Sequence, residues 1–309
     1  MDVGRSAFDV SFLFILLLVL ILMLVIGLVL PNVPLMPKKP GRPSPRRSSP
    51  SASPARTRKI KRYGWIPDIP DQRDFLYAAP PAFLRALPPR VHLRKQCPPI
   101  YDQGQLGSCT SNAIGGAIEF DQMKEKLPQI FIPSRLFVYY NERVIEGTVN
   151  TDAGAMLRDG IKTVAKQGAC PEPMWPYLIA KFKSKPSAAC YKEAAKHTAV
   201  SYQRLVQSLS QMQGCLASGY PFVFGFTVYE SFETDTVART GHAPMPGSGE
   251  HVLGGHAVCA VGYNTTRRWF ICRNSWGTSW GMRGYFTIPF AYLTDSDLSA
   301  DLWTIRIVS

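Results

Sequence analysis

The chain contains no two cysteines separated by two residues, although it has seven cysteines in all. Zinc ribbons and thioredoxin-like redox sites are built on C-x-x-C pairs, so neither is expected. The sequence predicts no metal and no cofactor. Because seven is an odd number, at least one thiol stays unpaired in any scheme of disulfides within one chain. Whether the other six pair is left open.

Charge is absent from residues 10–30, and acidic charge is absent from residues 31–62. The 21 residues of the first stretch, at about 1.5 Å each in a helix, cross a hydrocarbon core of about 30 Å. The second stretch holds eight prolines and ten basic residues, a composition typical of disordered segments. We predict a short tail over residues 1–9, a transmembrane helix over residues 10–30 and a flexible tether over residues 31–62. A cleaved signal peptide is the alternative for the apolar run, but the run is too long and no small-residue cleavage site follows it.

The net charge of +13 is concentrated next to the apolar run, because residues 31–62 contribute +10 and residues 63–309 only +4. This placement favours a lipid bilayer as the partner, spanned by residues 10–30 and touched at its anionic lipids by residues 38–62. No nucleic-acid partner is expected. Only Arg5 precedes the run, so the positive-inside rule predicts a single-pass membrane protein with a cytoplasmic body. The sequon at Asn264 would instead suit a luminal domain.

Residues 63–86 place aromatic and aliphatic residues between prolines, which predicts an irregular strap on the body or a segment removed on activation. The body itself, residues 87–309, has helix-like patterns first and strand-like patterns later. This order favours an α+β fold with two lobes. Helices are expected near residues 109–126, 133–146, 155–166 and 204–218, and strands near residues 222–229, 256–263, 269–273 and 284–288.

Cys109 is the residue best placed to be a nucleophile. It follows the glycine-containing loop 104–108 at the start of a predicted helix that Ser108 would cap. The helix dipole favours a thiolate at that end. For a cysteine considered alone, a buried structural role is the commoner one. Gln103 lies six residues upstream, where its amide N–H could reach an oxyanion that also meets the Cys109 backbone N–H.

His256 follows a glycine pair and enters an apolar strand, where a general base would have room beside a substrate backbone. Asn274 comes directly after the strand 269–273. A hairpin at Asn264 would pair the two strands and bring Asn274 next to His256, so its side-chain oxygen would fix the ring orientation. Trp276 would screen that hydrogen bond from water.

Four motifs in this order resemble the papain family of cysteine peptidases: Gln103-Gly104, Gly107-Ser108-Cys109, Gly255-His256-Ala257 and Asn274-Ser275-Trp276-Gly277. The resemblance covers about residues 87–309. It implies a papain-like two-lobed α+β fold, in which the helical lobe carries Cys109 and the β-rich lobe carries His256 and Asn274. It also implies a cysteine endopeptidase that acts on a polypeptide substrate, with Gln103 in the oxyanion hole. By the same likeness Gly154 and Gly255 would lie along the substrate backbone.

The chain departs from the family pattern at Leu106 and Thr110, where the family has a cysteine and an aromatic residue. One characteristic disulfide is therefore missing, which agrees with a reducing compartment. This form of the motif is similar to the branch found in bacteria, archaea and large DNA viruses. Two alternatives stay open: a catalytically silent papain-like module that binds peptides, and a structural membrane protein whose basic tether is its functional part.

Overall fold

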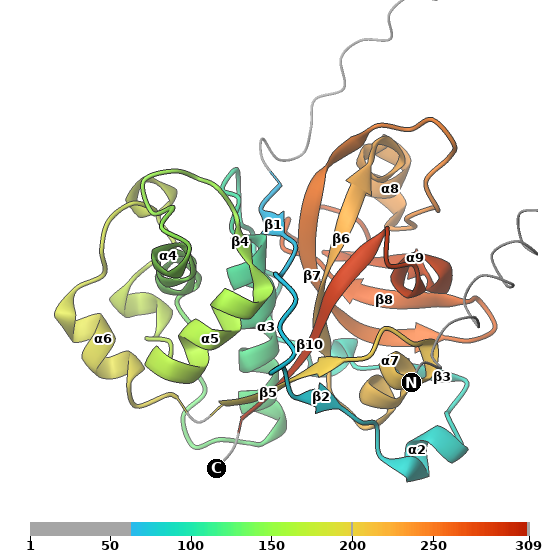
Figure 1. The fold of residues 1–309 in the computed structure, drawn as a ribbon, viewed down its shortest axis with the longest axis horizontal. Helices are drawn as coiled ribbons and strands as arrows, with labels where there is room; N and C mark the ends of the chain where they lie inside the picture. Colours follow the sequence, from blue (N-terminus) through green and yellow to red (C-terminus); the bar gives the residue numbers. More distant parts are fainter. Residues whose placement is uncertain (1–62, 199, 308–309) are drawn as a thin grey trace, which may run out of the picture. The chain divides into compact units, whose positions relative to one another are not determined.

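The computed structural model describes residues 63–198 and 200–307 of the 309-residue chain. The predicted tail, transmembrane helix and tether lie outside the described residues. Within the two described ranges, no helix combines the length and the apolar character needed to cross a bilayer. The folded body has its three longest helices on one side and most strands on the other (Figure 1), which confirms the α+β prediction.

The helical side is built around α3 (Cys109–Lys124), a helix buried on nearly every face from its first residue to Gln122. Small residues let neighbouring elements approach it closely. A Cβ at Gly116 would lie 2.5 Å from the Nη1 of Arg273, which comes from the opposite side of the body. The other helices on this side are α4 (Arg135–Ile145), α5 (Leu157–Gln167) and α6 (Ala188–Ala194) (Figure 1).

The β-rich side is an eight-stranded sheet in the order β2-β5-β10-β6-β7-β8-β9, with β3 paired to β7 outside this order. Its apolar residues and those of α3 belong to one continuous core. The strands are β2 (Leu76–Tyr77), β3 (Arg90–His92), β5 (Val200–Leu205), β6 (Phe222–Tyr229), β7 (Val252–Asn264), β8 (Trp269–Arg273), β9 (Tyr285–Pro289) and β10 (Ser299–Ile307). Four further helices lie on this side, namely α2 (Pro81–Arg85), α7 (Leu209–Ala217), α8 (Asp235–Thr240) and α9 (Phe290–Thr294).

The predicted hairpin is present, because β7 and β8 are antiparallel with Asn264 opposite Trp269. The bounds of β6 and β8 are those predicted. Three helix predictions were wrong at their starts, and α4 begins at Arg135 rather than at residue 133. Helix α5 begins at Leu157 because residues 155–156 form the short strand β4 (Ala155–Met156), and α7 begins at Leu209 because the chain before it forms β5.

Residues 63–86, which we call the strap, begin between the helical and the β-rich sides and end at α2 on the β-rich side (Figure 1). The strap makes two short parallel pairings with the body. Strand β1 (Trp65–Ile66) pairs with β4, and β2 pairs with β5 at the edge of the large sheet. The first of these pairings lies beside the residues considered next.

Candidate active site

Cys109 is the first residue of α3 and is fully buried. The loop before it is fixed by Gly107, whose N–H donates to the carboxylate of Asp152 at 3.1 Å. Ser108 occupies the N-cap position, but its side chain makes no capping hydrogen bond, so that prediction was wrong. The Ser108 hydroxyl is instead paired with the hydroxyl of Tyr177.

His256 and Asn274 are brought together by the β7–β8 hairpin. The Nε2 of His256 lies 2.8 Å from the Oδ1 of Asn274, which also accepts the Ser275 N–H at 2.8 Å. An amide oxygen only accepts, so Nε2 carries the ring proton and Nδ1 is left with a lone pair. No hydrogen-bond partner for Nδ1 exists in the described part of the chain. The Trp276 ring covers this pair, with its centroid 4.8 Å from that of the imidazole.

The thiol of Cys109 lies at the backbone N–H of Ala257, the residue after His256. The N–H groups of Thr110 and of Gly64 in the strap also reach the thiol, and all three favour its charged form. Burial outweighs them and raises the pKa of Cys109 to about 12. Burial also lowers the pKa of His256 to about 4, against the opposing effect of the Asn274 hydrogen bond. With the strap in place, both groups are therefore neutral near pH 7.

Gln103 is fully buried between the loop before α3 and the segment after β8. Its Nε2 donates to the Leu106 carbonyl at 2.9 Å, and its Oε1 accepts the Ser275 hydroxyl at 2.6 Å. The Gln103 backbone N–H donates to the Ser275 carbonyl at 2.8 Å. These bonds hold the amide in one orientation and use only one of its two N–H donors.

The strap crosses this cluster of residues directly. The Gly64 N–H lies at the thiol, and the Gly64 carbonyl accepts a hydrogen bond from the Ala155 N–H at 2.8 Å. The Tyr63 ring lies 6.1 Å from the His256 ring and 6.4 Å from that of Trp276, centroid to centroid. The nucleophile candidate is thus covered by a backbone segment of the same chain.

Both glycines expected along a substrate backbone contact the strap. A Cβ at Gly154 would lie 2.3 Å from the Gly64 carbonyl oxygen, and the φ of Gly154 is +81°. A Cβ at Gly255 would lie 2.6 Å from the carbonyl oxygen of Trp65. A side chain at either position would push out an extended peptide, so both glycines border a groove of backbone width.

A model of the papain family cysteine proteases matches residues 87–295. The chain belongs to this family. It is 40% identical over 273 residues to an uncharacterized peptidase C1-like protein of Acanthamoeba polyphaga mimivirus, covering 81% of this chain and 88% of that protein. The structure of xylellain, a cysteine protease of Xylella fastidiosa, is similar with a TM-score of 0.76 and 45% identity, over 82% of this chain and 98% of that one. A Carica candamarcensis cysteine protease solved with E-64 has a TM-score of 0.55 at 20% identity, over 72% of this chain and all (100%) of that chain, which supports the fold alone.

The chain is therefore a papain-family cysteine peptidase, and its relatives include a viral and a bacterial protein, as the motif form indicated. All seven cysteines are free thiols in the described structure. The family disulfide that would need a cysteine in place of Leu106 is therefore missing, and the described body contains no other disulfide.

The sequence did not point to two residues that lie beside the candidate active site of this papain-family peptidase. Gly225 lies in β6 against the Trp65 indole, and Asp301 in β10 accepts the indole N–H at 3.1 Å. A glycine inside an otherwise apolar strand signals close approach of another group, so Gly225 could have been found. Asp301 has no comparable local signal.

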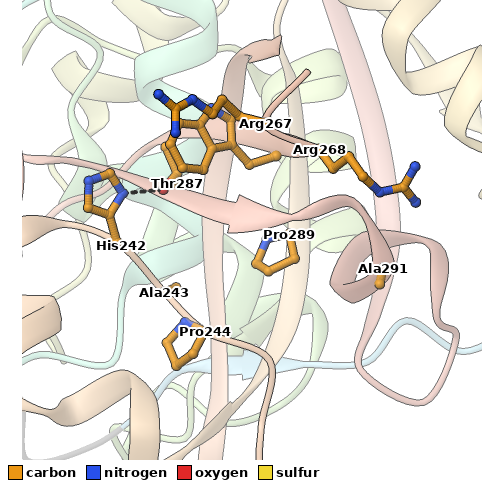
Figure 2. A pocket seen from close by; sticks show the side chains of 9 residues that line it. His242, Ala243, Pro244, Arg267, Arg268, Thr287, Pro289 and Ala291 are labelled. Carbon is orange, nitrogen blue, oxygen red and sulfur yellow. Dashed lines mark hydrogen bonds between the residues drawn. The ribbon is translucent and has the colours of Figure 1, made fainter. Parts of the chain in front are cut away.

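A separate surface pocket of ≈ 470 Å³ contains none of the candidate active-site residues (Figure 2). In it, His242 stacks on Trp269 with ring centroids 5.3 Å apart. The Nδ1 of His242 lies 2.8 Å from the Thr287 hydroxyl (Figure 2). No cluster of three or more His, Cys, Asp or Glu side chains within residues 63–198 and 200–307 is arranged to hold a metal ion.

Proposed function

We propose that the chain hydrolyses peptide bonds with Cys109 as nucleophile, His256 as acid and base, and Asn274 as the group that orients the imidazole. The observation that carries this proposal is the one-sided bonding of His256. Its Nε2 is bound to Asn274 and its Nδ1 keeps a lone pair, while the thiol lies at the backbone N–H of the next residue, Ala257. A base needs such a lone pair to take the thiol proton.

The reaction proceeds in two halves. The Cys109 proton passes to Nδ1 of His256 as the sulfur attacks the peptide carbonyl carbon, and a tetrahedral oxyanion forms. The second N–H of the Gln103 amide and the Cys109 backbone N–H stabilise this oxyanion. His256 then protonates the leaving amine as the C–N bond breaks. Water attacks the resulting thioester and gives its proton to His256, and the acid product leaves as the thiol re-forms.

We further propose that the uncut chain is latent, because the strap occupies the groove that a substrate needs. The Gly64 contacts with Cys109 and Ala155, and the Trp65 contact with Gly255, support this. The neutral thiol and imidazole under the strap support it as well, since the reactive form of cysteine is the thiolate.

The membrane attachment stays a proposal that rests on the sequence. Residues 10–30 span a bilayer, residues 31–62 reach from it past anionic lipid, and the peptidase body faces the cytoplasm. An epitope at the C-terminus of the full chain, in sealed membranes, tests the topology. Protection of that epitope by an intact vesicle whose cytoplasmic face points outward would contradict the cytoplasmic orientation.

The catalytic proposal is tested on the full chain with a site for a specific protease placed in the mostly exposed stretch 69–73 of the strap. After the cut, we expect peptide hydrolysis that Cys109→Ala abolishes. Cys97→Ala, which removes a different free thiol, is the control and should retain activity. Hydrolysis that survives Cys109→Ala would overturn the mechanism. A cut chain that binds peptides without cleaving them would identify the catalytically silent module instead.

A further inference from the structure

Thr110, the residue after the nucleophile, makes a contact that the proposed mechanism does not use. The papain-family pattern has an aromatic residue at this position, and a hydroxyl group stands there in this chain. The Thr110 hydroxyl donates to Oε1 of Glu142 at 2.8 Å, and both residues are fully buried. Ser111 and Asn112 instead donate within the turn, to the Ser108 carbonyl at 3.0 and 2.8 Å. Thr110 therefore ties the first turn of α3 to α4, its neighbour on the helical side (Figure 1).

The second carboxyl oxygen of Glu142 faces the bare backbone of α5. A Cβ at Gly160 would lie 2.5 Å from Oε2 of Glu142, so the absence of a side chain there makes room for the carboxyl group. Within the described residues, Oε2 has no hydrogen-bond partner. The guanidinium of the next residue, Arg143, donates elsewhere, to the carbonyl oxygens of Tyr139 and Val149 at 3.0 Å each. In residues 63–198 and 200–307, the side chain of Glu142 thus has a donor at one oxygen only.

The surroundings of Glu142 favour its uncharged form. A buried carboxylate with few donors is costly, and burial raises the pKa of Glu142 well above its usual range. Glu146 on the same helix and Asp159 on α5 raise this pKa further. The Thr110 hydroxyl and Arg143 act in the opposite direction but do not outweigh burial. An uncharged carboxyl group still accepts the Thr110 hydroxyl, so this contact does not require a charge.

The charge of Glu142 matters for the nucleophile. The Thr110 backbone N–H reaches the thiol of Cys109 and favours its charged form. A negative charge on Glu142 would raise the pKa of Cys109, because like charges close together oppose each other. An uncharged Glu142 therefore keeps the hydrogen bond to Thr110 and adds no negative charge beside the thiolate.

We propose that Glu142 is a positioning residue for the Cys109 reaction, and that it works as an uncharged acid that accepts the Thr110 hydroxyl. This hydrogen bond holds the first turn of α3 so that the Thr110 N–H stays at the sulfur. The inference rests on the proposed peptidase function and adds a residue that supports its nucleophile.

The test measures the rate of Cys109 alkylation against pH on the full chain cut in residues 69–73. The midpoint is the pH at which the rate is half its plateau. Glu142→Gln keeps an oxygen for the Thr110 hydroxyl and cannot carry a charge, so its midpoint should equal that of the parent. Thr110→Val removes the donor and Glu142→Leu removes the acceptor. Both should raise the midpoint by about one pH unit, because the Thr110 N–H is no longer held at the sulfur.

The midpoints separate positioning from charge and from packing. A midpoint in Glu142→Gln that differs from the parent's by about one pH unit, in either direction, would overturn the uncharged state of Glu142. Unchanged midpoints in Thr110→Val and Glu142→Leu would assign the contact to packing alone and overturn the positioning role, even where urea unfolds these variants earlier.

A matched control and a double variant identify the bond responsible. Glu146→Gln changes an acid one turn along α4 whose Oε1 accepts the Met156 N–H at 2.7 Å, and its midpoint should remain that of the parent. A rise like that of Thr110→Val would contradict a specific role of Glu142. The double variant Thr110→Val with Glu142→Leu should shift no further than either single variant, since both break the same bond. Shifts that add would contradict the shared bond.

Peptide hydrolysis keeps this inference separate from the peptidase proposal. With active enzyme counted by Cys109 labelling, Thr110→Val should lower kcat by about tenfold near pH 7 and leave KM little changed, because the loss falls on the nucleophile. A loss confined to KM would contradict the positioning role. If no cut chain, the parent included, hydrolyses any peptide, the peptidase proposal fails, and the alkylation midpoints still decide the role of Glu142.

Discussion

The Nε2 of His256 lies 2.8 Å from the Oδ1 of Asn274, and this single hydrogen bond decides which ring nitrogen is available for chemistry. The bond is enclosed, since both residues are almost fully buried and Trp276 lies over the imidazole. A hydrogen bond screened from water keeps its geometry, so the lone pair on Nδ1 has a fixed direction.

Burial of His256 makes the folded state sensitive to acid. Because the pKa of this group is lowered to about 4 in the folded chain, the unfolded chain binds more protons between about pH 4 and pH 6.5. Stability is therefore lost as the pH falls through this window, by about 3 kcal/mol for a shift of this size. His256→Gln should remove that part of the loss, whereas the exposed His251→Gln should not. Urea unfolding at pH 7 and pH 4.5 measures both.

Comparing the two variants with the parent also cancels the contribution of Asp68 to the pH dependence of stability, which has the opposite sign. Burial, with the neighbouring Asp301 carboxylate, raises the pKa of Asp68 to about 6, so this group favours the folded state as the pH falls through 6. Asp68 is common to the three proteins and cancels. Equal acid sensitivity of the parent and His256→Gln would refute the assignment to His256.

Gln103 should affect the chemical step more than substrate binding. Gln103→Glu keeps an oxygen that can accept the Ser275 hydroxyl. It removes both amide N–H donors, the one bound to the Leu106 carbonyl and the one that we propose binds the oxyanion. We expect kcat of the cut chain to fall by about 10²–10³-fold, the usual effect of losing one oxyanion donor, with KM little changed. Gln105→Glu, an exposed residue in the same loop, is the matched control. A loss confined to KM would place Gln103 outside the oxyanion hole.

The strap should be released by breaking an ion pair far from the thiol. Asp74 of the strap is paired with Arg158 of α5 and lies 3.2 Å from Nη1 of Arg204, and its side chain is only 10% exposed. Loss of one partner of such a pair costs a few kcal/mol, so Asp74→Ala should raise the rate of Cys109 alkylation in the uncut chain by at least tenfold. Asp71→Ala breaks the exposed pair with Arg73, whose side chain is 87% exposed, and should change little. Mass spectrometry of the labelled Cys109 peptide measures both rates, and equal rates in the two variants would contradict the proposed latency.

The pH dependence of Cys109 alkylation should also show whether the strap buries the thiol. Only the thiolate reacts, and burial raises the pKa of Cys109 to about 12 in the closed chain. The uncut chain should therefore be labelled slowly at pH 7, with a rate that rises about tenfold per pH unit through pH 9. After the cut, the thiol loses part of its burial and the rate should level off at a lower pH. Profiles that coincide before and after the cut would indicate that the strap does not bury the thiol.

The residues of the cluster could be anticipated because their signals are local. Strands β7 and β8 are apolar runs separated by a short turn. The hairpin at Asn264 follows from their spacing and places Asn274 beside His256. Cys109 stands where a glycine-containing loop meets an apolar helix. The position of each residue depends on a few neighbours in sequence, which a single chain displays.

The contacts of the strap could not be anticipated in the same way. Trp65 and Asp301 are 236 residues apart, and their hydrogen bond depends on a register change in β10 and an uncommon backbone angle. Neither feature leaves a periodic pattern. The missed start of α5 has a similar cause, because residues 155–156 are extended where they pair with the distant strand β1.

The pairing of β2 with β5 determines whether an activated molecule exposes an edge of the large sheet to other molecules in solution. Within residues 63–198 and 200–307, strand β5 is bordered on its outer side only by Leu76 and Tyr77. Removal of the whole strap would therefore leave unpaired backbone donors and acceptors along that edge of the sheet. Open sheet margins of this kind promote self-association. A cut between residues 69 and 73 would clear the groove and keep β2 in place, and the mature enzyme should then stay monomeric at concentrations where a form beginning after Tyr77 aggregates.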